Sequence, residues 1–355
     1  MNIFESMEKF GHEELVFWYD KTTGLKAIVG IHDTTLGPAL GGCRMWPYAS
    51  EDEAIVDVMR LSRGMTYKNA AMGLDLGGGK SVIWADSRQD KSEALFRAFG
   101  RLIQSLGGRY ITAEDVGINA EDMALVARET EFVGGLKETS GDPSPATALG
   151  VLVGMKAAAN LVWGTESLQG RTVAVQGLGH VGGILARMLA DEGATLIVTD
   201  IHSDEGRALA AELKADWVEP NDIYGVSADI FAPCALGAIL NDETIPQLKC
   251  RVVAGSANNQ LKDPRHGLDL LKRNIVYVPD YVINGGGVVN VADEFHRDGY
   301  HPERAYARVR QIGGQVSEIL NRAQVERIPT QEAADRLAES RIHVLGRVYS
   351  TYVPE

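Results

Sequence analysis

Hydrophobic and polar positions in the first part of the chain follow two different periods. Residues 15–19 and 26–32 are short runs rich in β-branched and aromatic side chains, which predict strands. Residues 51–64 place apolar side chains on one helical face, and residues 93–106 repeat that pattern. The first part of the chain is therefore expected to mix strands with helices.

The second part alternates regularly between the two kinds of element. A helix is predicted first, over 146–161. Short runs with the composition of buried strands then follow at 172–176, 195–199, 229–232, 252–254 and 275–278. Helical patterns lie among these runs, for example at 181–191, 203–213 and 267–273. This alternation predicts an α/β fold with a parallel, doubly wound sheet.

Two breaks divide these patterns. The irregular stretch 138–145 (ETSGDPSP) separates the two parts, and we expect it to be a hinge. A chain of 355 residues also favours two domains. Near the end, Pro329-Thr330 supplies a break and a candidate N-cap between predicted helices at 302–322 and 331–347.

Composition narrows the class of protein. The net charge of −13 argues against a nucleic-acid partner, because phosphate binding needs a basic surface. The three cysteines are widely spaced and odd in number, so we expect neither a disulfide framework nor a metal site. We find no long apolar run, and Glu5 and Glu8 lie where a signal peptide would be apolar. These features predict a soluble, cytoplasmic protein without a membrane segment.

A dinucleotide fingerprint lies at the start of the alternating part. Gly177-Leu178-Gly179-His180-Val181-Gly182 is a G-x-G-x-x-G that directly follows one predicted strand and opens a helix. The second strand of this unit ends at Asp200, 18 residues after Gly182. The free N–H groups of the helix N-terminus attract phosphates, so this unit predicts a Rossmann domain that binds a dinucleotide.

Asp200 favours one cofactor over the other. Its carboxylate can accept both ribose hydroxyls of the adenosine, and its charge would repel a 2′-phosphate. No arginine or lysine follows it until Arg207, seven positions further on. We therefore expect NAD rather than NADP.

Two lysines lie near a run of glycines in the first part. Residues 76–81 read LGGGKS, which lacks the first glycine of a phosphate-binding P-loop because position 74 is leucine. The glycines before Lys80 would let a ligand approach the backbone. A lysine acts as a base only where burial or a second ammonium, such as that of Lys68, lowers its pKa. From spacing alone, two solvated surface lysines remain the alternative.

An acidic pair follows at Glu114-Asp115. Adjacent residues in an extended segment point in opposite directions, so only one of the two can face a site. A turn carboxylate without chemistry is the alternative.

Motifs along the whole chain occur in the order of one known family. They are GPALGGCR from residue 37, MTYKN from 65, GGGK from 77, Asp115, GDPSPAT from 141, GLGHVG from 177, FAPCALG from 231, NNQ from 258 and PDYVINGGGVVN from 279. By these motifs the chain resembles the Glu/Leu/Phe/Val dehydrogenase family, most closely its leucine dehydrogenase branch, from about residue 3 to 350. The resemblance implies NAD-dependent, reversible oxidative deamination of an L-amino acid to its 2-oxo acid with release of ammonia.

The resemblance also implies roles for single residues. Lys80 matches the general base, which acts through a water on the α-carbon, and Asp115 matches the acid/base for the ammonia protons. Lys68, helped by Asn259, matches the partner of the substrate carboxylate. Further substrate residues are implied at Gly41, Gly42 and Met65. Cofactor contacts are implied at Thr147, residues 177–182, Asp200, Cys234, Ala235, Ala257, Asn259 and Asn284.

The side-chain pocket is the variable part of this family. Its lining is implied at Leu40, Ala113, Val288 and Val291, which are all apolar. Position 134 is Gly where the leucine enzymes usually carry Thr, so it either leaves space for Phe or Trp or serves a turn beside Gly135. The alternatives are thus an aromatic amino-acid dehydrogenase of this family, or a catalytically silent nucleotide-binding homologue. Retention of both lysines with Asp115 argues against the silent homologue.

The family also implies the assembly of the domains. Its C-terminal helix returns to the first domain, so we expect a catalytic domain at 1–140 with about 330–355, and an NAD-binding domain at 146–329. The expected partners are small molecules, and a homo-oligomer (an octamer or a dimer) is expected.

Overall fold

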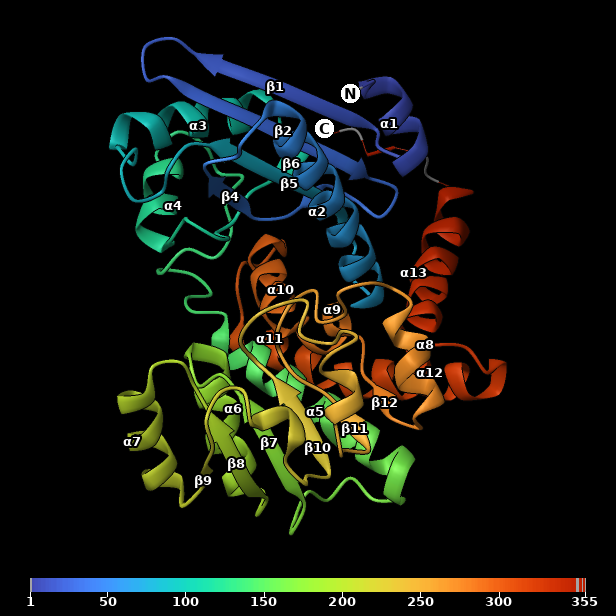
Figure 1. Cartoon of the computed structure of the whole chain (residues 1–355). Coiled ribbons are helices and arrows are strands. Elements are labelled where there is room, and N and C mark those ends of the chain that lie inside the picture. The colour runs from blue at the N-terminus through green and yellow to red at the C-terminus, as the bar shows by residue number, and fades with distance from the viewer. Residues whose placement is uncertain (1, 349–350, 353, 355) are drawn as a thin grey trace. The chain divides into compact units, whose positions relative to one another are not determined.

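The computed structural model describes residues 2–348, 351–352 and 354, and the chain divides into two compact units (Figure 1). The first unit comprises Met1–Asp142, Val291–Tyr300 and Ala338–Glu355, and the second comprises Pro143–Asn290 and His301–Leu337. The first unit thus includes a ten-residue segment that we had expected in the other domain. Of the expected segment 330–355, residues 349–350, 353 and 355 lie outside the described residues.

The first unit is built on a six-stranded sheet. Its path runs β1-β2-β5-β3-β6, and β4 pairs with β5. Pairing is antiparallel between β1 and β2 and between β2 and β5, whereas β3, β4 and β6 join by parallel pairing. The strands are β1 (Glu14–Asp20), β2 (Leu25–Asp33), β3 (Ala39–Leu40), β4 (Cys43–Trp46), β5 (Gly77–Trp84) and β6 (Tyr110–Ile111).

Helices bury both faces of this sheet. Ile28 and Val82 pack with apolar residues of α2 (Glu51–Ala71), such as Ile55. Val29 and Ile83 pack with residues of α3 (Glu93–Ser105) and α4 (Ala120–Val126). Burial on both faces explains why β2 is a nearly continuous apolar run. Helix α1 (Ile3–Phe10) and helix α4 were not predicted from the sequence.

Helix α2 is longer than its predicted span. Ser50 caps its N-terminus by accepting a hydrogen bond from the Glu53 backbone N–H at 3.2 Å. At the other end, Asn69 Nδ2 donates to the carbonyl of Gly77 at 2.6 Å. This buried side chain ties the last turn of α2 to the start of β5, which the periodicity of residues 51–64 could not indicate.

The glycine run before Lys80 is a strand and not a loop. A Cβ atom at Gly78 would lie 2.1 Å from the Thr66 backbone nitrogen of α2, and one at Gly79 would lie 2.6 Å from the Tyr110 ring. The expectation that these glycines admit a ligand is therefore wrong. They let α2 and Tyr110 pack directly on β5, and a P-loop is excluded because the segment is extended.

The second unit is a doubly wound sheet, as predicted. Its order is β12-β11-β10-β7-β8-β9, and every pair is parallel. The sequence order reverses beside β7, which is the switch point of such folds. The strands are β7 (Thr172–Gln176), β8 (Thr195–Thr199), β9 (Asp216–Trp217), β10 (Ile230–Pro233), β11 (Val252–Val253) and β12 (Val276–Tyr277).

Helices connect these strands and follow them. They are α5 (Ser144–Trp163), α6 (His180–Asp191), α7 (Ser203–Leu213), α8 (His266–Lys272), α9 (Asp280–Ile283), α10 (Gly286–Ala292), α11 (Pro302–Arg310) and α12 (Ile312–Glu326). The single helix predicted over 302–322 is thus broken at Gln311. Among the described residues, α5 is long and apolar enough to cross a membrane, but 56% of its apolar window is buried in the protein. It packs against α6, α11 and α12, which makes it a core helix.

The C-terminal helix was expected to return to the first domain; the part of α13 (Thr330–Gly346) from Ala338 onward belongs to the first unit, whereas the part up to Leu337 belongs to the second. Arg341 donates to the Leu74 carbonyl at 2.5 Å and to Asp75 Oδ1 at 2.8 Å. Tyr67 of α2 donates its hydroxyl hydrogen to Glu339 at 2.8 Å. These bonds hold the C-terminal half of α13 against the end of α2.

Candidate active site

Two predicted site residues of the first unit form an ion pair in which the lysine is buried. Lys80 lies on the central strand β5 and is only 5% exposed, so a solvated surface lysine is excluded. Its Nζ lies 3.1 Å from Asp115 Oδ2. Asp115 follows β6 in an extended segment that runs along β4, where the Met45 N–H donates to the Val116 carbonyl at 2.9 Å. The strand pairing therefore joins two residues that are distant in sequence.

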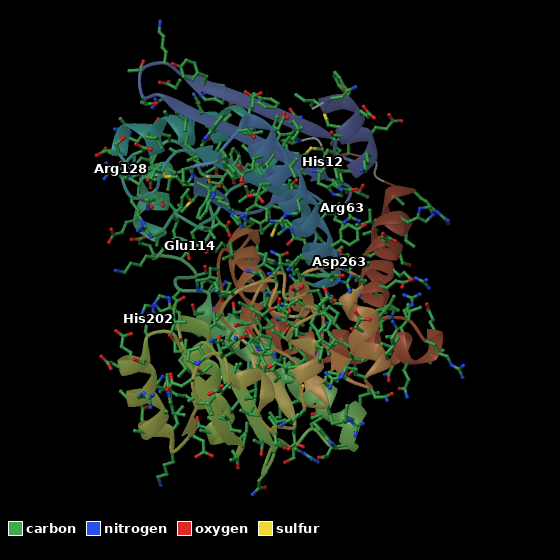
Figure 2. The ribbon with its side chains drawn as sticks, viewed as in Figure 1. His12, Arg63, Glu114, Arg128, His202 and Asp263 are labelled. Carbon is green, nitrogen blue, oxygen red and sulfur yellow. The ribbon has the colours of Figure 1, made fainter. Side chains whose placement is uncertain are left out.

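The charge on Asp115 is set by its surroundings. Burial alone would raise the pKa of this carboxyl, but the cations of Lys80 and Arg44 hold its pKa below the ordinary value. Asp115 is therefore an ionised carboxylate at neutral pH. Its neighbour Glu114, labelled in Figure 2, contributes a backbone carbonyl that packs against Gly42.

Gly41 and Gly42 lie where β3 leads into β4 and crosses close to β5. A Cβ atom at Gly41 would lie 1.8 Å from the Gly79 carbonyl oxygen and 3.1 Å from the Met65 side chain. One at Gly42 would lie 2.4 Å from the carbonyl oxygen of residue 114. Glycine is thus required by backbone packing at both positions. Lys68 follows Met65 by one turn on α2, so the two share a helical face.

Three predicted pocket residues of the first unit lie on neighbouring segments. Leu40 of β3 pairs with Ile111 of β6, and Ala113 continues that strand. The Gly134 N–H donates to the Thr112 carbonyl at 2.8 Å, which places residue 134 beside the same segment. Leu40 is buried, and Ala113 is partly buried. This part of the first unit is apolar.

The space beside Gly134 is filled. A Cβ atom there would lie 2.7 Å from Val291 Cγ1 and 3.0 Å from the Phe295 ring. The expectation that Gly134 leaves room for a larger substrate is therefore wrong, because Phe295 and Val291 occupy that room. Gly135, and not Gly134, has the left-handed backbone of a turn, with φ +77°. Phe295 was not predicted as a neighbour of Gly134, because the two residues are far apart in the sequence and no motif links them.

The dinucleotide turn of the second unit has the close packing that its glycines predict. Gly177 has φ +94°, and a Cβ atom there would lie 2.8 Å from the Ala235 Cβ. One at Gly182 would lie 2.0 Å from the Gly177 carbonyl oxygen, whereas one at Gly179 would meet nothing within 4 Å. Open space at Gly179, at the N-terminus of α6, suits a pyrophosphate.

Asp200 lies at the end of β8 beside this turn. Its Oδ2 accepts the Leu178 N–H at 2.6 Å and its Oδ1 accepts the His202 N–H at 2.8 Å. Arg207 lies 2.6 Å from Glu219 and its guanidinium packs on the Trp217 ring at 4.7 Å. The first basic residue after Asp200 therefore already has an acidic partner.

The remaining predicted cofactor residues lie on loops and helix ends of the second unit. Cys234 follows β10, and its N–H donates to the Gln176 carbonyl at 2.7 Å. Thr147 Oγ1 donates to the Pro143 carbonyl at 2.9 Å in the first turn of α5. Asn284 Nδ2 donates to the Ser256 carbonyl at 3.1 Å, beside the buried Ala257. His180 and Val181 open α6 and Ala235 lies in the loop after β10, whereas Val288 lies on α10.

Asn259 has an unusual backbone conformation. Its φ of +52° is left-handed, and its carbonyl accepts the Ala238 N–H at 2.7 Å. Its side chain is part of an exposed residue. The bond to the carbonyl helps to hold this uncommon backbone conformation.

Two apolar residues near the dinucleotide turn were missed from the sequence. Ile201 and Leu236 are 78% and 72% exposed and follow the carboxyl ends of β8 and β10. Ligands of open α/β sheets bind at that edge, so exposed apolar side chains there suit a flat ring. The sequence could have indicated them only by position, since Ile201 directly follows Asp200 and Leu236 directly follows residues 231–235 (FAPCA).

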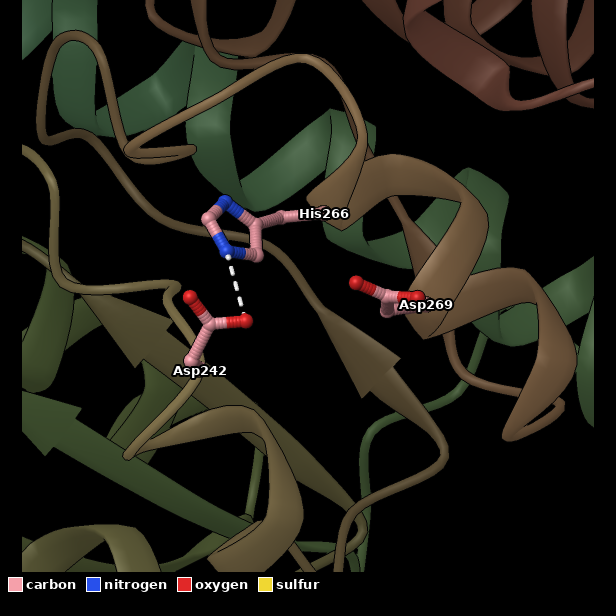
Figure 3. Close-up of side chains that lie close together, drawn as sticks. All are labelled: Asp242, His266 and Asp269. Atoms are coloured by element: carbon pink, nitrogen blue, oxygen red, sulfur yellow. Dashed lines mark ion pairs between the residues drawn. The ribbon is translucent and has the colours of Figure 1, made fainter.

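A group with metal-ligand side chains lies elsewhere in the second unit. Figure 3 shows Asp242, His266 and Asp269, with His266 Nε2 3.6 Å from Asp242. Arg265 Nη1 donates to Asp242 Oδ1 at 2.8 Å and lies 3.6 Å from Asp269 Oδ2. An arginine cation thus already lies between the two carboxylates, and we explain the group as an ion-pair network.

Comparison with known proteins agrees with these features. Residues 13–132 match the model of the Glu/Leu/Phe/Val dehydrogenase dimerisation domain, and residues 139–204 and 198–344 match that of the Glutamate/Leucine/Phenylalanine/Valine dehydrogenase domain. The chain is 57% identical to a leucine dehydrogenase of Geobacillus stearothermophilus, over 99% of this chain and 96% of that protein. It is 48% identical to a phenylalanine dehydrogenase of Thermoactinomyces intermedius, over 97% and 95%.

A solved structure shares the fold closely. The L-tryptophan dehydrogenase of Nostoc punctiforme superimposes with a TM-score of 0.87 at 44% identity, covering 97% of this chain and 100% of that one. The domain models match nearly the full length, and the order of motifs agrees with them. The chain therefore belongs to the Glu/Leu/Phe/Val dehydrogenase family.

Proposed function

We propose that this protein is an NAD-dependent L-amino-acid dehydrogenase that reversibly deaminates leucine and similar branched-chain amino acids to their 2-oxo acids and ammonia. The observation that carries the proposal is the ion pair of the buried Lys80, on the central strand β5, with Asp115 at 3.1 Å. A lysine costs free energy to bury, and it is retained here beside an ionised partner. Relatives named leucine dehydrogenase, 57% identical over nearly the full length, support the substrate class.

In this proposal the charged site residues of the first unit have separate catalytic or binding roles. Lys80 is the general base, acting through a water on the α-carbon, and Asp115 receives and returns the protons of the amino group. Lys68 of the first unit binds the substrate carboxylate. NAD, when bound, would accept the hydride of the α-carbon. The resulting imine is hydrolysed by water, which releases ammonia.

The proposed side-chain pocket is apolar. The proposed lining residues of the first unit, Leu40, Ala113 and Val291, offer no charge, so the second carboxylate of glutamate would enter without a partner. Each additional methylene that fits adds roughly 1 kcal/mol, so leucine, isoleucine and valine are expected to differ by only about tenfold. Because Phe295 and Val291 fill the space beside Gly134, a leucine-sized substrate is favoured over phenylalanine and tryptophan.

NAD is the proposed cofactor. The open space at Gly179 suits the pyrophosphate, and the Asp200 carboxylate suits free ribose hydroxyls. Arg207 is held by Glu219 and Trp217 and would have to leave both to meet a 2′-phosphate. The charge pattern therefore disfavours NADP.

We further propose a cytoplasmic homo-oligomer, either an octamer or a dimer. Strand β1 is an edge strand, and Phe17 and Tyr19 on it are 44% and 66% exposed. Exposed apolar edges are normally covered by a partner. Light scattering of the purified protein would give the mass of the particle, and a monomer at micromolar concentration would contradict this proposal.

A substrate panel tests the proposed function. The purified protein is mixed with NAD and each of leucine, isoleucine, valine, phenylalanine, tryptophan and glutamate, and formation of reduced cofactor and ammonia is followed. We expect the three branched-chain amino acids to have the highest kcat/KM and glutamate the lowest. Preference for glutamate, or no reaction with any L-amino acid, would contradict the proposal.

A further inference from the structure

Arg44 is a half-buried cation beside the Lys80–Asp115 pair. It lies on β4 and its side chain is 20% exposed. Its Nε donates to Asp115 Oδ2 at 3.2 Å, and its Nη1 donates to Asp57 Oδ2 on α2 at 2.9 Å. Arg44 thus links α2, β4 and the segment that carries Asp115.

One carboxylate oxygen of Asp115 binds both the Lys80 and the Arg44 cation. Lys80 Nζ and Arg44 Nε bind the same atom, Asp115 Oδ2, at 3.1 and 3.2 Å. The negative charge of Asp115 is therefore shared and is not reserved for Lys80. Two donors from different strands also fix the rotation of the carboxylate, which a single contact would leave free.

The guanidinium itself is held from the other side. Asp57 Oδ2 also accepts the Tyr48 hydroxyl at 2.8 Å, and Asp57 Oδ1 accepts Arg60 Nη2 at 2.9 Å. Arginine can bridge the two acids because its nitrogens form a planar fork, whereas lysine offers one nitrogen. The arrangement therefore specifies arginine and not merely a positive charge.

Other titratable groups around Asp115 do not change charge in the working range. Burial raises the pKa of the Cys43 thiol to about 12. Burial likewise raises the pKa of the Tyr110 and Tyr48 hydroxyls far above neutrality. The pKa of Asp57 lies below its ordinary value, because Tyr48, Arg44 and Arg60 outweigh the effect of its burial. Near neutral pH, Lys80, Arg44 and Asp57 are therefore charged groups in the ion-pair network of Asp115.

We propose that Arg44 is a positioning residue: it fixes the Asp115 carboxylate against Lys80, shares its charge, and so sets the pH range in which the pair works. The inference rests on the proposed function, since the pair must move protons for its pH range to matter. Removing the Arg44 charge makes the remaining pair hold its protons more tightly. The pH profile of the reaction should then move to higher pH.

Three variants test this inference. Arg44→Met removes the charge at similar length, and Arg44→Lys keeps a charge with one nitrogen. Arg60→Met is the matched control, because Arg60 binds the same Asp57 but not Asp115. For Arg44→Met we expect kcat/KM for leucine at pH 7 to fall about tenfold or more, and its pH profile to move up by about one unit. Arg60→Met should keep the wild-type profile, and Arg44→Lys should keep the profile with a lower kcat.

A second readout does not need catalysis. Carboxyl-labelled aspartate allows the Asp115 signal to be titrated by carbon NMR, after assignment with Asp115→Asn. The midpoint should rise in Arg44→Met and stay unchanged in Arg60→Met, with circular dichroism used to check folding. Unchanged midpoints in Arg44→Met, or equal shifts in both variants, would overturn the inference. If Arg44→Met does not fold, Arg44→Lys decides, because a wild-type kcat in that variant would also overturn it. An inactive wild type would contradict the proposed function, whereas the NMR titration would still test Arg44.

Discussion

Gly134 shows how a single residue is explained by its packing. The room that a side chain would need is taken by Val291 and Phe295, which belong to the short segment that returns to the first unit. Any larger residue at 134 must displace both. Since Val291 is a proposed pocket residue, a side chain at position 134 that displaces Val291 would also change the shape of the substrate pocket.

Gly134→Ala should therefore lower the free energy of unfolding by about 1–3 kcal/mol, the usual cost of overpacking. It should also lower activity on phenylalanine more than on leucine, because displaced Val291 narrows the pocket. Adding Phe295→Leu should recover part of the stability. Gly64→Ala is the control, because a Cβ atom there meets nothing within 4 Å in the exposed face of α2. Denaturant unfolding of the four proteins is the measurement, and a Gly134→Ala variant as stable as wild type would disprove the packing argument.

Some site residues could be predicted from the sequence and others could not. The G-x-G-x-x-G and Asp200 carry a local signal, since strand, turn and acid lie within one βαβ unit. Arg44 ends the GPALGGCR motif, but nothing local indicates its ion pairs, because its partners Asp57 and Asp115 are 13 and 71 residues away and only the tertiary fold joins them. Lys80 and Asp115 were found through the family motifs, whereas spacing alone left both lysines as possible surface residues.

Strand β5 illustrates the same limit for a whole element. Glycine disfavours strands, so no strand was predicted at GGGK, and the reason for glycine there is that α2 and Tyr110 pack against this segment. The strands β7, β8 and β10 were predicted because each is a short apolar run flanked by a helix. Likewise, the return of Val291–Tyr300 to the first unit depends on contacts such as Glu294, which accepts the N–H groups of Gly135 and Ser140 at 3.1 and 3.2 Å. The hydrophobic periodicity of a sequence cannot predict such long-range hydrogen bonds.

The β8–α7 connection gives a prediction about the cofactor. Replacing Asp200 with Ser and Ile201 with Arg removes a repulsive carboxylate and supplies a phosphate partner. The ratio of kcat/KM for NADP to that for NAD should rise by about tenfold or more, which corresponds to roughly 1.4 kcal/mol. Arg207→Gln is the control and should leave the ratio unchanged, because Arg207 is held by Glu219. If the wild type already prefers NADP, the assignment of Asp200 is wrong.

At the scale of the whole molecule, two buried histidines make stability depend on pH. His12 Nε2 lies 2.9 Å from Ser62 Oγ, and His32 Nδ1 lies 2.8 Å from Thr66 Oγ1, so both contact α2. Burial lowers the pKa values of both rings to about 4, with contributions from the Arg63 cation and, for His12, from the neighbouring His32. Figure 2 labels His12 and Arg63. The folded protein therefore keeps these rings neutral while the unfolded chain protonates them near pH 6.5.

Stability is therefore lost as pH falls from about 6.5 to about 4, because the unfolded state binds protons that the folded state excludes. Each histidine can contribute at most about 3 kcal/mol to this loss. A His12→Gln/His32→Gln variant should show a flatter fall of melting temperature with acid than the wild type. The exposed His202→Gln is the control, and equal slopes for all three proteins would show that the buried pair does not govern acid stability.

The most direct test of the proposed catalytic role is Lys80→Ala, measured for both turnover and NAD binding. Loss of a general base should lower kcat for leucine by about 10² or more. The dissociation constant of NAD should stay near that of the wild type, because Lys80 belongs to the first unit and the dinucleotide turn to the second. Lys21→Ala, at an exposed lysine of the same unit, should change neither quantity. Near-normal turnover in Lys80→Ala would contradict the central claim that the buried Lys80 drives deamination.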